Sequence, residues 1–525
     1  MCTCEHHSRR PVTASRRALL AGSTGLVTTA AVLRFDPAAA GESRTETYTG
    51  SFRGVATPDW HYLPVEVPPG VREIEVSYSY EKTDTGLGFS ANVIDIGIFD
   101  PRGTDLDDGN GATGFRGWSG GARDSFRISA RRATPGYLAG PITAGTWHVA
   151  LGPFAVVPPG VDYEVTVTLR FGRERRRFRP DPAPRRVRGT GPGWYRGDCH
   201  LHTVHSDGRH TQASLAALAR EAGLDFIGST EHNTSSAQLT WGRHTPDDLL
   251  VLNGEEVTTR AGHWLALGLP AGTWVDWRFR PEDDALTTFT ERVRGVGGLA
   301  VTAHPFAPGP GSTWGFDPTY AAMDLVEIWN GPWTLDDQFA VEAWHALLVA
   351  GTYVPVMGSS DSHTEDQVVG LPQTVVRAGT LSTPAVVRGL RGGHSWIAES
   401  SAVDLSLTAS LGDRTATCGE ALGAAATDLV DVRLTVTGAP GCLAQLRGPV
   451  GVLGGAVTDD EGAGEVVVTV PAGLVPFVRA EVRRLDGAPV LDPLAGVPAL
   501  AMVAMTNPVF LGAGPSRRTG AATGS

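Results

Sequence analysis

The sequence has few long apolar runs, and its only candidate membrane segment lies in the first forty of its 525 residues. A membrane-spanning helix needs about 20 strongly apolar residues. The run that ends at Leu33 is shorter and is rich in glycine, alanine and threonine. It follows the twin-arginine motif SRRALL at residues 15–20 and precedes three alanines at residues 38–40, which are typical of a cleavage site. We therefore predict a cleaved twin-arginine signal peptide at residues 1–40, export of the protein to the periplasm, the cell surface or the medium, and no stable membrane insertion.

Clustered positive charge is also scarce. The formal net charge is −12, and an acidic surface repels duplex nucleic acid and anionic membranes. We therefore expect neither of them as a partner. The exception is the segment at residues 173–192, which is rich in arginine and is interrupted by Pro180, Pro182 and Pro184, and this composition is typical of a solvated linker between domains.

The sequence contains no P-loop, and cysteine is rare. No Gly-x-Ser-x-Gly elbow surrounds Ser206, Ser360 or Ser362, the serines next to the candidate ligands described below, which argues against a covalent serine mechanism there. Of the five cysteines, Cys2 and Cys4 lie in the predicted signal peptide and Cys199 lies in a histidine-rich segment. Cys418 and Cys442 could form a disulfide outside the cytoplasm, although their spacing does not fix the pairing.

The pattern of apolar residues divides the remaining chain into three domains. Residues 45–172 and 401–511 contain short runs in which apolar and polar residues alternate, and this pattern predicts two β-sandwiches. Residues 193–399 alternate short apolar strands with helical segments, which predicts an α/β domain whose parallel sheet is either open or closed into a barrel. The tail at residues 512–525 is expected to be disordered.

Histidines and carboxylates follow the predicted strands of the middle domain. Ten of the 15 histidines fall between His200 and His363. The candidate ligands are His200, His202, Asp207, His232, Glu255, His263, His304, Asp361 and His363. Burial of a polar group without a partner costs on the order of several kcal/mol. Nine such groups at one rim would therefore be very costly. Metal ligation resolves the cost, and imidazole with carboxylate but no thiolate indicates two or three divalent ions of Zn, Mn or Fe.

These segments resemble a known family. The motifs HLHT…SDG, STEHN, GEE, GHWLALG, AHP and SDSH occur in the order found in the PHP (polymerase and histidinol phosphatase) superfamily of metallohydrolases. The resemblance covers residues 193–399 and implies a distorted (β/α)7 barrel, flanked here by N-terminal and C-terminal β-sandwiches. The accessory sandwich and the closing AMTNP motif at residues 504–508 are similar to the CehA/McbA-type branch, which is named for carbaryl hydrolase.

The resemblance also implies a role for each candidate ligand. The first metal would be held by His200, His202, Glu255 and Asp361. Glu255 would bridge to a second metal that His263 and His304 complete, and Asp207, His232 and His363 would hold a third. Glu255 and Asp361 would thus take part in catalysis. Glu231 stands where the family more often has aspartate, so its longer arm is expected to alter the support of a neighbouring ligand.

Two histidines of the same loops, His205 and His210, are left without a metal. Each could act as a general acid, anchor the substrate, or be an ordinary surface residue.

Three functions remain open, all with a small molecule as the partner. The first is a phosphoesterase that cleaves mono- or diesters of nucleotides or small alcohols with a metal-activated water, for which Arg209, Arg243 or Arg260 could bind the phosphate. The second is a carbamate or carboxylic ester hydrolase with an apolar pocket, for which the candidate residues are Trp241, Trp264, Trp314, Trp329 and Trp333. The third is a non-catalytic carbohydrate- or surface-binding protein with structural metals. We rank the phosphoesterase first, and we expect the loop at residues 309–315 to form a wall or lid of the site.

Overall fold

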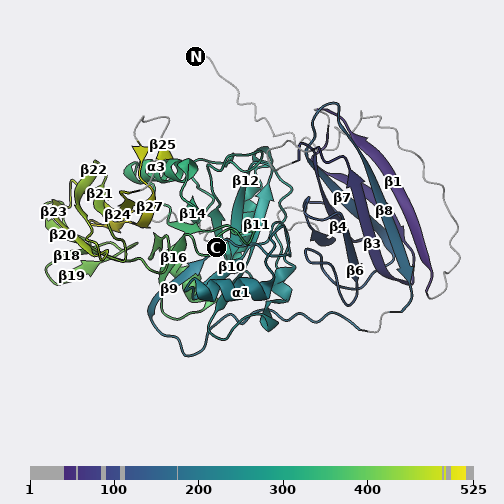
Figure 1. Cartoon of the computed structure of the whole chain (residues 1–525), viewed down its shortest axis with the longest axis horizontal. Coiled ribbons are helices and arrows are strands. Elements are labelled where there is room, and N and C mark those ends of the chain that lie inside the picture. Colours follow the sequence, from purple (N-terminus) through teal and green to yellow (C-terminus); the bar gives the residue numbers. More distant parts are fainter. Residues whose placement is uncertain are drawn as a thin grey trace, which may run out of the picture. The chain divides into compact units, whose positions relative to one another are not determined.

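The computed structural model describes residues 41–54, 57–83, 90–106, 113–173, 176–486, 490–491 and 498–515. The predicted signal peptide lies outside these ranges, and so do residues 516–525 of the predicted tail. Strands predominate over helices, and they form several sheets (Figure 1). Among the residues that the structure describes, no helix combines the length and the apolar character that crossing a membrane requires.

Two four-stranded antiparallel sheets occupy residues 43–171. One has the order β1 (Ser43–Phe52), β8 (Val161–Phe171), β3 (Val71–Tyr80) and β6 (Ser125–Ser129). The other has the order β2 (His61–Val67), β7 (Gly145–Ala155), β4 (Val93–Phe99) and β5 (Phe115–Trp118). Every second residue of β8 is buried, because successive side chains of a strand point to opposite faces. Ile74, Ile96, Trp147 and Val165, which come from both sheets, belong to one shared core.

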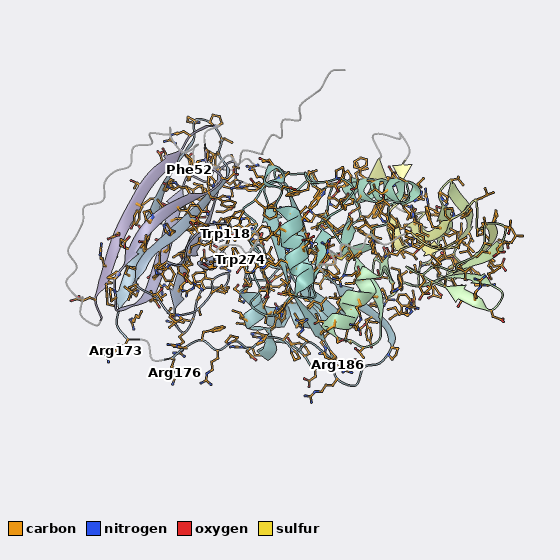
Figure 2. The ribbon with its side chains drawn as sticks, turned by 180° about the vertical axis from the view of Figure 1, so that it is seen from behind. Phe52, Trp118, Arg173, Arg176, Arg186 and Trp274 are labelled. Carbon is orange, nitrogen blue, oxygen red and sulfur yellow. The ribbon has the colours of Figure 1, made fainter. Side chains whose placement is uncertain are left out.

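The arginine-rich segment between the N-terminal sheets and the middle of the chain is held by backbone hydrogen bonds. Arg173, Arg176 and Arg186, which are labelled in Figure 2, are exposed. The backbone N–H groups of Phe178 and Val187 nevertheless donate to the Ala130 and Leu381 carbonyls at 2.8 and 2.9 Å. The segment is therefore anchored at Phe178 and at Val187.

Residues 193–398 alternate strands with helices. Their elements are β9 (Gly193–Asp198), α1 (Gln212–Glu221), β10 (Phe226–Ser229), η2 (Ala237–Leu239), η3 (Trp241–Arg243), β11 (Leu250–Thr259), β12 (Gly262–Leu267), η4 (Pro281–Asp283), α2 (Leu286–Gly295), β13 (Leu299–Thr302), β14 (Leu325–Asn330), α3 (Leu335–Val349), β15 (Val356–Ser359), β16 (Gln373–Ala378), α4 (Thr383–Arg391) and β17 (Ser395–Ala398). Strands β9, β10 and β11 are parallel, and so are β13, β14 and β15. Strand β12 is antiparallel to β11 and β13, and β16 is antiparallel to β9, so the sheet is mixed rather than parallel throughout.

The expected (β/α)7 barrel is not closed. Strand β15 forms one end of the sheet, and the described strands contain no hydrogen-bonded ladder from β15 to β16. The Thr374 hydroxyl occupies the place of such a ladder, because it accepts from the Gly358 N–H at 3.0 Å and donates to the Gly358 carbonyl at 2.7 Å. Pro372 lies next to Gly358, since a Cβ on Gly358 would be 3.0 Å from the Pro372 ring. Because proline has no backbone N–H, Pro372 cannot donate a ladder hydrogen bond to β15. The sheet continues instead from β16 into β17 and the C-terminal strands.

The C-terminal strands form two layers around one core. One layer contains β19 (Arg414–Ala416), β18 (Asp404–Leu411), β20 (Leu429–Thr437) and β23 (Gly464–Pro471). The other layer continues the central sheet with β27 (Met502–Thr506), β24 (Phe477–Arg484), β21 (Cys442–Gly448) and β22 (Gly451–Val457), and β28 (Val509–Phe510) pairs with β24. A separate two-stranded sheet joins β25 (Val490–Leu491) to β26 (Pro498–Ala499). Cys418 and Cys442 are buried free thiols, so the disulfide considered for them is not formed.

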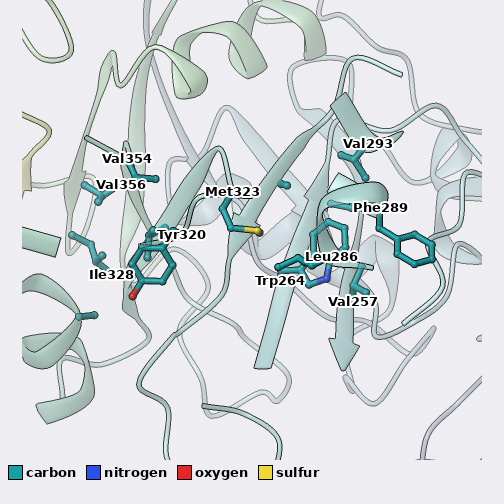
Figure 3. Close-up of a cluster of buried hydrophobic side chains, with 14 of the residues drawn as sticks. Val257, Trp264, Leu286, Phe289, Val293, Tyr320, Met323, Ile328, Val354 and Val356 are labelled. Carbon is teal, nitrogen blue, oxygen red and sulfur yellow. The ribbon is translucent and has the colours of Figure 1, made fainter. Parts of the chain in front are cut away.

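A large hydrophobic core lies under one side of the central sheet. Trp264 of β12 packs there with Leu286 and Phe289 of α2, and Tyr320 and Met323 belong to the same core (Figure 3). The core fixes the strands whose ends carry the polar residues described next.

Candidate metal centre

Eight of the nine predicted ligands converge at one end of the central sheet. Five strands position them. His200, His202 and Asp207 follow β9, His232 follows β10, His263 lies in β12, His304 follows β13, and Asp361 and His363 follow β15. With Glu256 of β11 they form three groups, and within each group the potential ligand atoms lie within 4.8 Å of one another. This is the edge where ligands of open α/β sheets generally bind.

The first group has the dimensions of a metal site. His200 Nε2 lies 3.2 Å from both Glu256 Oε2 and Asp361 Oδ1. His202 Nε2 lies 3.3 and 3.0 Å from the same two oxygens. Bonds of about 2.0–2.1 Å to a tetrahedral ion place two ligand atoms about 3.3 Å apart. The four atoms are therefore spaced as ligands of one ion.

The same four atoms lack hydrogen-bond partners. His200 Nε2, His202 Nε2, Glu256 Oε2 and Asp361 Oδ1 are all buried, and none forms a hydrogen bond with a described residue. Buried polar atoms without partners are rare in folded proteins and usually mark an ion or a water. Because the four atoms converge on one point, the residues fit a divalent cation.

Glu256 joins the first group to a second one. Its Oε1 lies 2.9 Å from His263 Nδ1 and 3.1 Å from His304 Nε2, while its Oε2 faces the first group. One carboxylate can therefore contact two neighbouring ions, one through each oxygen. His304 adopts a φ of 26° and Asp361 a φ of 50°, conformations that cost energy in residues other than glycine and that cluster at functional sites.

The third group is the most exposed. His232 Nε2 and His363 Nε2 lie 3.6 and 3.4 Å from Asp207 Oδ1, and the two imidazole nitrogens are 3.4 Å apart. His202 completes the group. The Asp207 side chain is 45% exposed, so solvent and substrate can reach this part of the centre.

Glu255, which was predicted to bridge the metals, does not lie in any group, and Glu256 takes its place. The Glu255 side chain points to the other face of β11, where its Oε2 accepts a hydrogen bond from the Val275 N–H at 3.0 Å. Burial raises the pKa of Glu255 well above its usual value. The correction follows from strand geometry, because neighbouring residues of a strand face opposite sides.

His205 and His210 lie beside the three groups without belonging to them. His205 Nδ1 is 2.9 Å from the Ser236 hydroxyl, and burial lowers the pKa of this imidazole. His210 Nε2 donates to the Thr364 carbonyl at 3.2 Å. Both histidines thus have local partners, and neither is among the residues that line the cavity described below.

Two residues that the sequence analysis did not single out support His200. The buried Glu327 carboxylate lies 3.2 and 3.3 Å from His200 Nδ1 and also accepts from the His304 N–H at 3.1 Å. Asn330 donates to Glu327 at 3.0 Å. A carboxylate behind a ligating histidine fixes the tautomer that leaves the other nitrogen free for the metal.

We expect Glu327→Gln to weaken metal binding by about 10- to 100-fold, because it removes the charge that keeps the proton on His200 Nδ1. A titration of metal against a competing chelator would measure this loss. Glu342→Gln, an exchange at an exposed residue of α3, is the matched control and should leave the affinity unchanged. Equal affinities of the two variants would contradict a supporting role for Glu327.

Glu231 organises the loop that carries His202. Its carboxylate accepts from the Thr203 hydroxyl and the Ser206 hydroxyl, both at 2.6 Å, and from the Thr203 N–H at 3.1 Å. Ser206 in turn lies 3.4 Å from His202 Nδ1. Glu231 is therefore connected to His202 through the Ser206 hydroxyl, and an effect of its longer arm on this ligand stays a prediction.

Charges within the centre shift the pKa values of the half-buried histidines of the third group. Burial opposes the charged form of His232, but Glu256 and Asp207 outweigh it and raise the pKa of His232 to about 9. Burial opposes charge on His363 as well, and Asp207 and Asp361 raise the pKa of His363 to about 10. His200, His202 and His363 hold the pKa of Asp361 well below its usual value in spite of burial. Asp207, Glu256 and Asp361 are thus the anionic partners of the six imidazoles in the three groups.

A cavity of about 680 Å³ opens next to the second and third groups. Asp207, His232 and His263 line it, together with Arg260 from the turn between β11 and β12. Pro310 and Ser312 also line it, so the loop predicted as a wall does form one, whereas Arg209 and Arg243 are not lining residues. None of the five tryptophans proposed for an apolar pocket lines this cavity. Trp241, Trp264 and Trp329 are buried in the hydrophobic interior, and Trp314 and Trp333 are partly buried and pack against the large core that contains Trp264.

Comparisons with known proteins give weak likenesses. No family model and no curated protein matches the sequence. A two-domain protein from Bacteroides vulgatus that contains a predicted PHP-like metal-dependent phosphoesterase is 16% identical, with a TM-score of 0.34 over 63% of this chain and 100% of its own. A candidate metal-dependent phosphoesterase from Bifidobacterium adolescentis is 19% identical, with a TM-score of 0.26 over 33% of this chain and 90% of its own. An amidohydrolase from Chromobacterium violaceum with bound sulfate is 18% identical, with a TM-score of 0.24 over 33% and 89%. At these values the function has to be argued from the site.

Proposed function

We propose that the protein is a metal-dependent hydrolase and, more narrowly, a phosphoesterase of the PHP superfamily with the accessory domains of the CehA/McbA-type branch. The observation that carries the proposal is Glu256, whose two oxygens face two adjoining groups of ligand atoms. Structural metal sites are usually closed and hold one ion. A shared carboxylate beside a solvent-exposed third group instead fits a catalytic cluster and speaks against the non-catalytic alternative.

One set of residues would bind the metal ions, and another would bind the substrate. The three groups would hold two or three divalent ions of Zn, Mn or Fe. When bound, such ions lower the pKa of water and neutralise charge on phosphoryl oxygens. Arg260 lies in the cavity beside His232 and His263, where its guanidinium can bind a phosphoryl oxygen. In the overall reaction, water oxygen bonds to phosphorus, the bond from phosphorus to the ester oxygen breaks, and the alcohol leaves with a proton.

A carbamate or carboxylic ester hydrolase is the second candidate. The observation that favours it is the aromatic lining of the cavity, to which Trp60, Trp118, Phe154 and Trp277 contribute. Such a lining would suit an aryl carbamate. Export through a twin-arginine signal peptide at residues 1–40 remains part of the proposal for either reaction.

The test compares initial rates of the leaderless, metal-loaded protein on matched aryl substrates: a phosphomonoester, a phosphodiester and an N-methylcarbamate. Asp361→Ala, which removes a ligand of the first group, serves as the blank. A phosphoester rate well above the blank supports the first candidate, and a carbamate preference supports the second. Activity retained by Asp361→Ala would contradict the metal site itself.

We also expect metal-stripped protein to regain activity with Mn²⁺ or Zn²⁺ and not with Ca²⁺. Six imidazoles contribute to the three groups, and Ca²⁺ prefers six to eight oxygen ligands. Rates after addition of each ion, with bound metal measured in parallel, would check this. Full recovery with Ca²⁺ would show that the imidazoles are not ligands.

A further inference from the structure

The N-terminal sheets form one side of the cavity next to the metal centre. Trp60 precedes β2, Asp95 lies in β4, Trp118 in β5 and Phe154 in β7, and all four line the cavity that His232 and His263 close from the other side. The accessory sheets therefore reach a place where they can contact a substrate held at the metals.

This wall is fixed to the central domain by many contacts. Phe115 stacks on Trp274 with ring centroids 4.0 Å apart, and Trp118 packs on Trp277 at 4.6 Å; Trp118 and Trp274 are labelled in Figure 2. The Gly136 N–H donates to the Ser236 hydroxyl at 3.1 Å, and its carbonyl accepts from Thr234 at 2.8 Å. A wall with this many contacts is pre-organised, so binding to it costs little ordering of side chains.

Arg260 links the two sides of the cavity. Its guanidinium carbon lies 5.2 Å from the Trp60 ring centroid and 4.8 Å from the Phe154 ring centroid. Its Nε is buried and forms no hydrogen bond with a described residue. Guanidinium planes and aromatic rings both stack on flat groups. Trp60 and Phe154 thus hold Arg260 in a group of flat surfaces beside the metals.

Asp95 is an unpaired carboxyl in the same cavity. It forms no hydrogen bond or ion pair with any residue that the structure describes, although Arg260 acts on it electrostatically. Gly120 and Gly121 leave the space next to it open, because a Cβ at either position would lie 3.7 Å from Asp95 Oδ1. A partly buried carboxyl without a partner can accept a hydrogen bond from a ligand.

We propose that the N-terminal sheets form the leaving-group pocket of the enzyme, and that the leaving group is a planar aromatic alcohol with a hydrogen-bond donor at its edge. The flat surfaces of Trp60, Phe154 and Arg260 select the ring, and Asp95 accepts from the donor. This inference rests on the proposed phosphoesterase function and adds the class of its substrate. Both a nucleoside and a simple substituted aryl alcohol carry this chemistry, and a cavity of about 680 Å³ is large enough for either.

The experiment compares three phosphomonoesters whose leaving alcohols are primary: benzyl, cyclohexylmethyl and 3-aminobenzyl phosphate. Release of inorganic phosphate by the metal-loaded protein is measured. We expect kcat/KM for benzyl phosphate to exceed that for cyclohexylmethyl phosphate by about tenfold. The kcat/KM for 3-aminobenzyl phosphate should be higher than that for benzyl phosphate. A nucleoside monophosphate is the fourth substrate, and its rate relative to 3-aminobenzyl phosphate distinguishes the two sources of the ring.

Variants assign the preference to the wall. Trp60→Ala and the milder Phe154→Leu should reduce the preference for the aromatic ester to about twofold or less, mostly through KM, while bound metal stays unchanged. Asp95→Asn should abolish only the preference for the amino group. Trp194→Ala, which removes an indole that is 43% exposed on β9 outside the cavity, is the matched control and should keep all preferences.

Binding provides a second readout that does not need turnover. Benzylphosphonate should bind the metal-loaded protein more tightly than cyclohexylmethylphosphonate, and calorimetry on the same variants would measure the difference. If no ester is hydrolysed above the Asp361→Ala blank, the proposed function is wrong, yet the phosphonate affinities still report on the pocket. Equal affinities and equal rates for the planar and saturated rings would overturn the inference even if the phosphoesterase activity is present.

Discussion

Glu256→Gln is expected to remove almost all activity, whereas Glu255→Gln should leave it nearly unchanged. Glu256 contacts ligand atoms of two groups, one through each oxygen. Loss of a residue that supports a single ligand typically costs about 10- to 100-fold, so loss of a ligand shared by two ions should cost roughly the product, on the order of 10²- to 10⁴-fold in kcat/KM. Bound metal should fall as well, because glutamine offers one neutral oxygen in place of a bridging carboxylate.

Glu255 is a close control for this experiment. It neighbours Glu256 in the chain, is equally buried, and undergoes the same chemical exchange. Burial raises its pKa well above the usual value and so favours the neutral form, and glutamine keeps an oxygen that accepts from the Val275 N–H. We expect a change of no more than about threefold in kcat/KM. Metal analysis and initial rates of both variants decide the matter, and a large loss in Glu255→Gln with none in Glu256→Gln would reverse the assignment.

The choice between the two glutamates also shows what the sequence could and could not predict. The motif GEE places two acids next to each other in one strand, and only the register decides which one faces the candidate metal ligands. In the structure, Thr258 pairs with His263 across the β11–β12 hairpin, so the face of β11 that carries Thr258 and Glu256 also carries His263. Recognising this hairpin in the sequence would have selected Glu256, because residues two apart share a face.

Glu327 could not be found in the same way. It lies within β14, in an apolar run that predicts an ordinary buried strand, and only its three-dimensional proximity to His200 reveals its part. The open barrel has a similar cause. Periodicity predicts strands and helices well, but closure depends on the backbone groups of Gly358, which a threonine from a later strand occupies. The contribution of the N-terminal sheets to the cavity likewise depends on domain docking, which alternation within strands does not encode.

The stabilisation of the protein by metal is expected to grow as the pH rises from about 6.5 to about 9. In the metal-free protein, carboxylates raise the pKa of His232 to about 9 and that of His363 to about 10, against an ordinary value of 6.5. The folded chain therefore binds more protons than the unfolded chain within this interval. Stability from these two histidines is fully present below about pH 6.5 and is lost as the pH approaches 9 to 10.

Metal ions change the direction of this dependence, because they compete with protons for the same nitrogens. Binding must release the protons of His232 and His363, so metal affinity rises with pH until both imidazoles are neutral. Thermal unfolding of metal-free and metal-loaded protein across the interval should show Tm falling with pH in the first case and the gap between the two widening. His232→Gln combined with His363→Gln should flatten the metal-free curve. If the difference in Tm between metal-loaded and metal-free protein stays constant with pH, the metal does not displace protons from these histidines. They would then not be ligands of the metal.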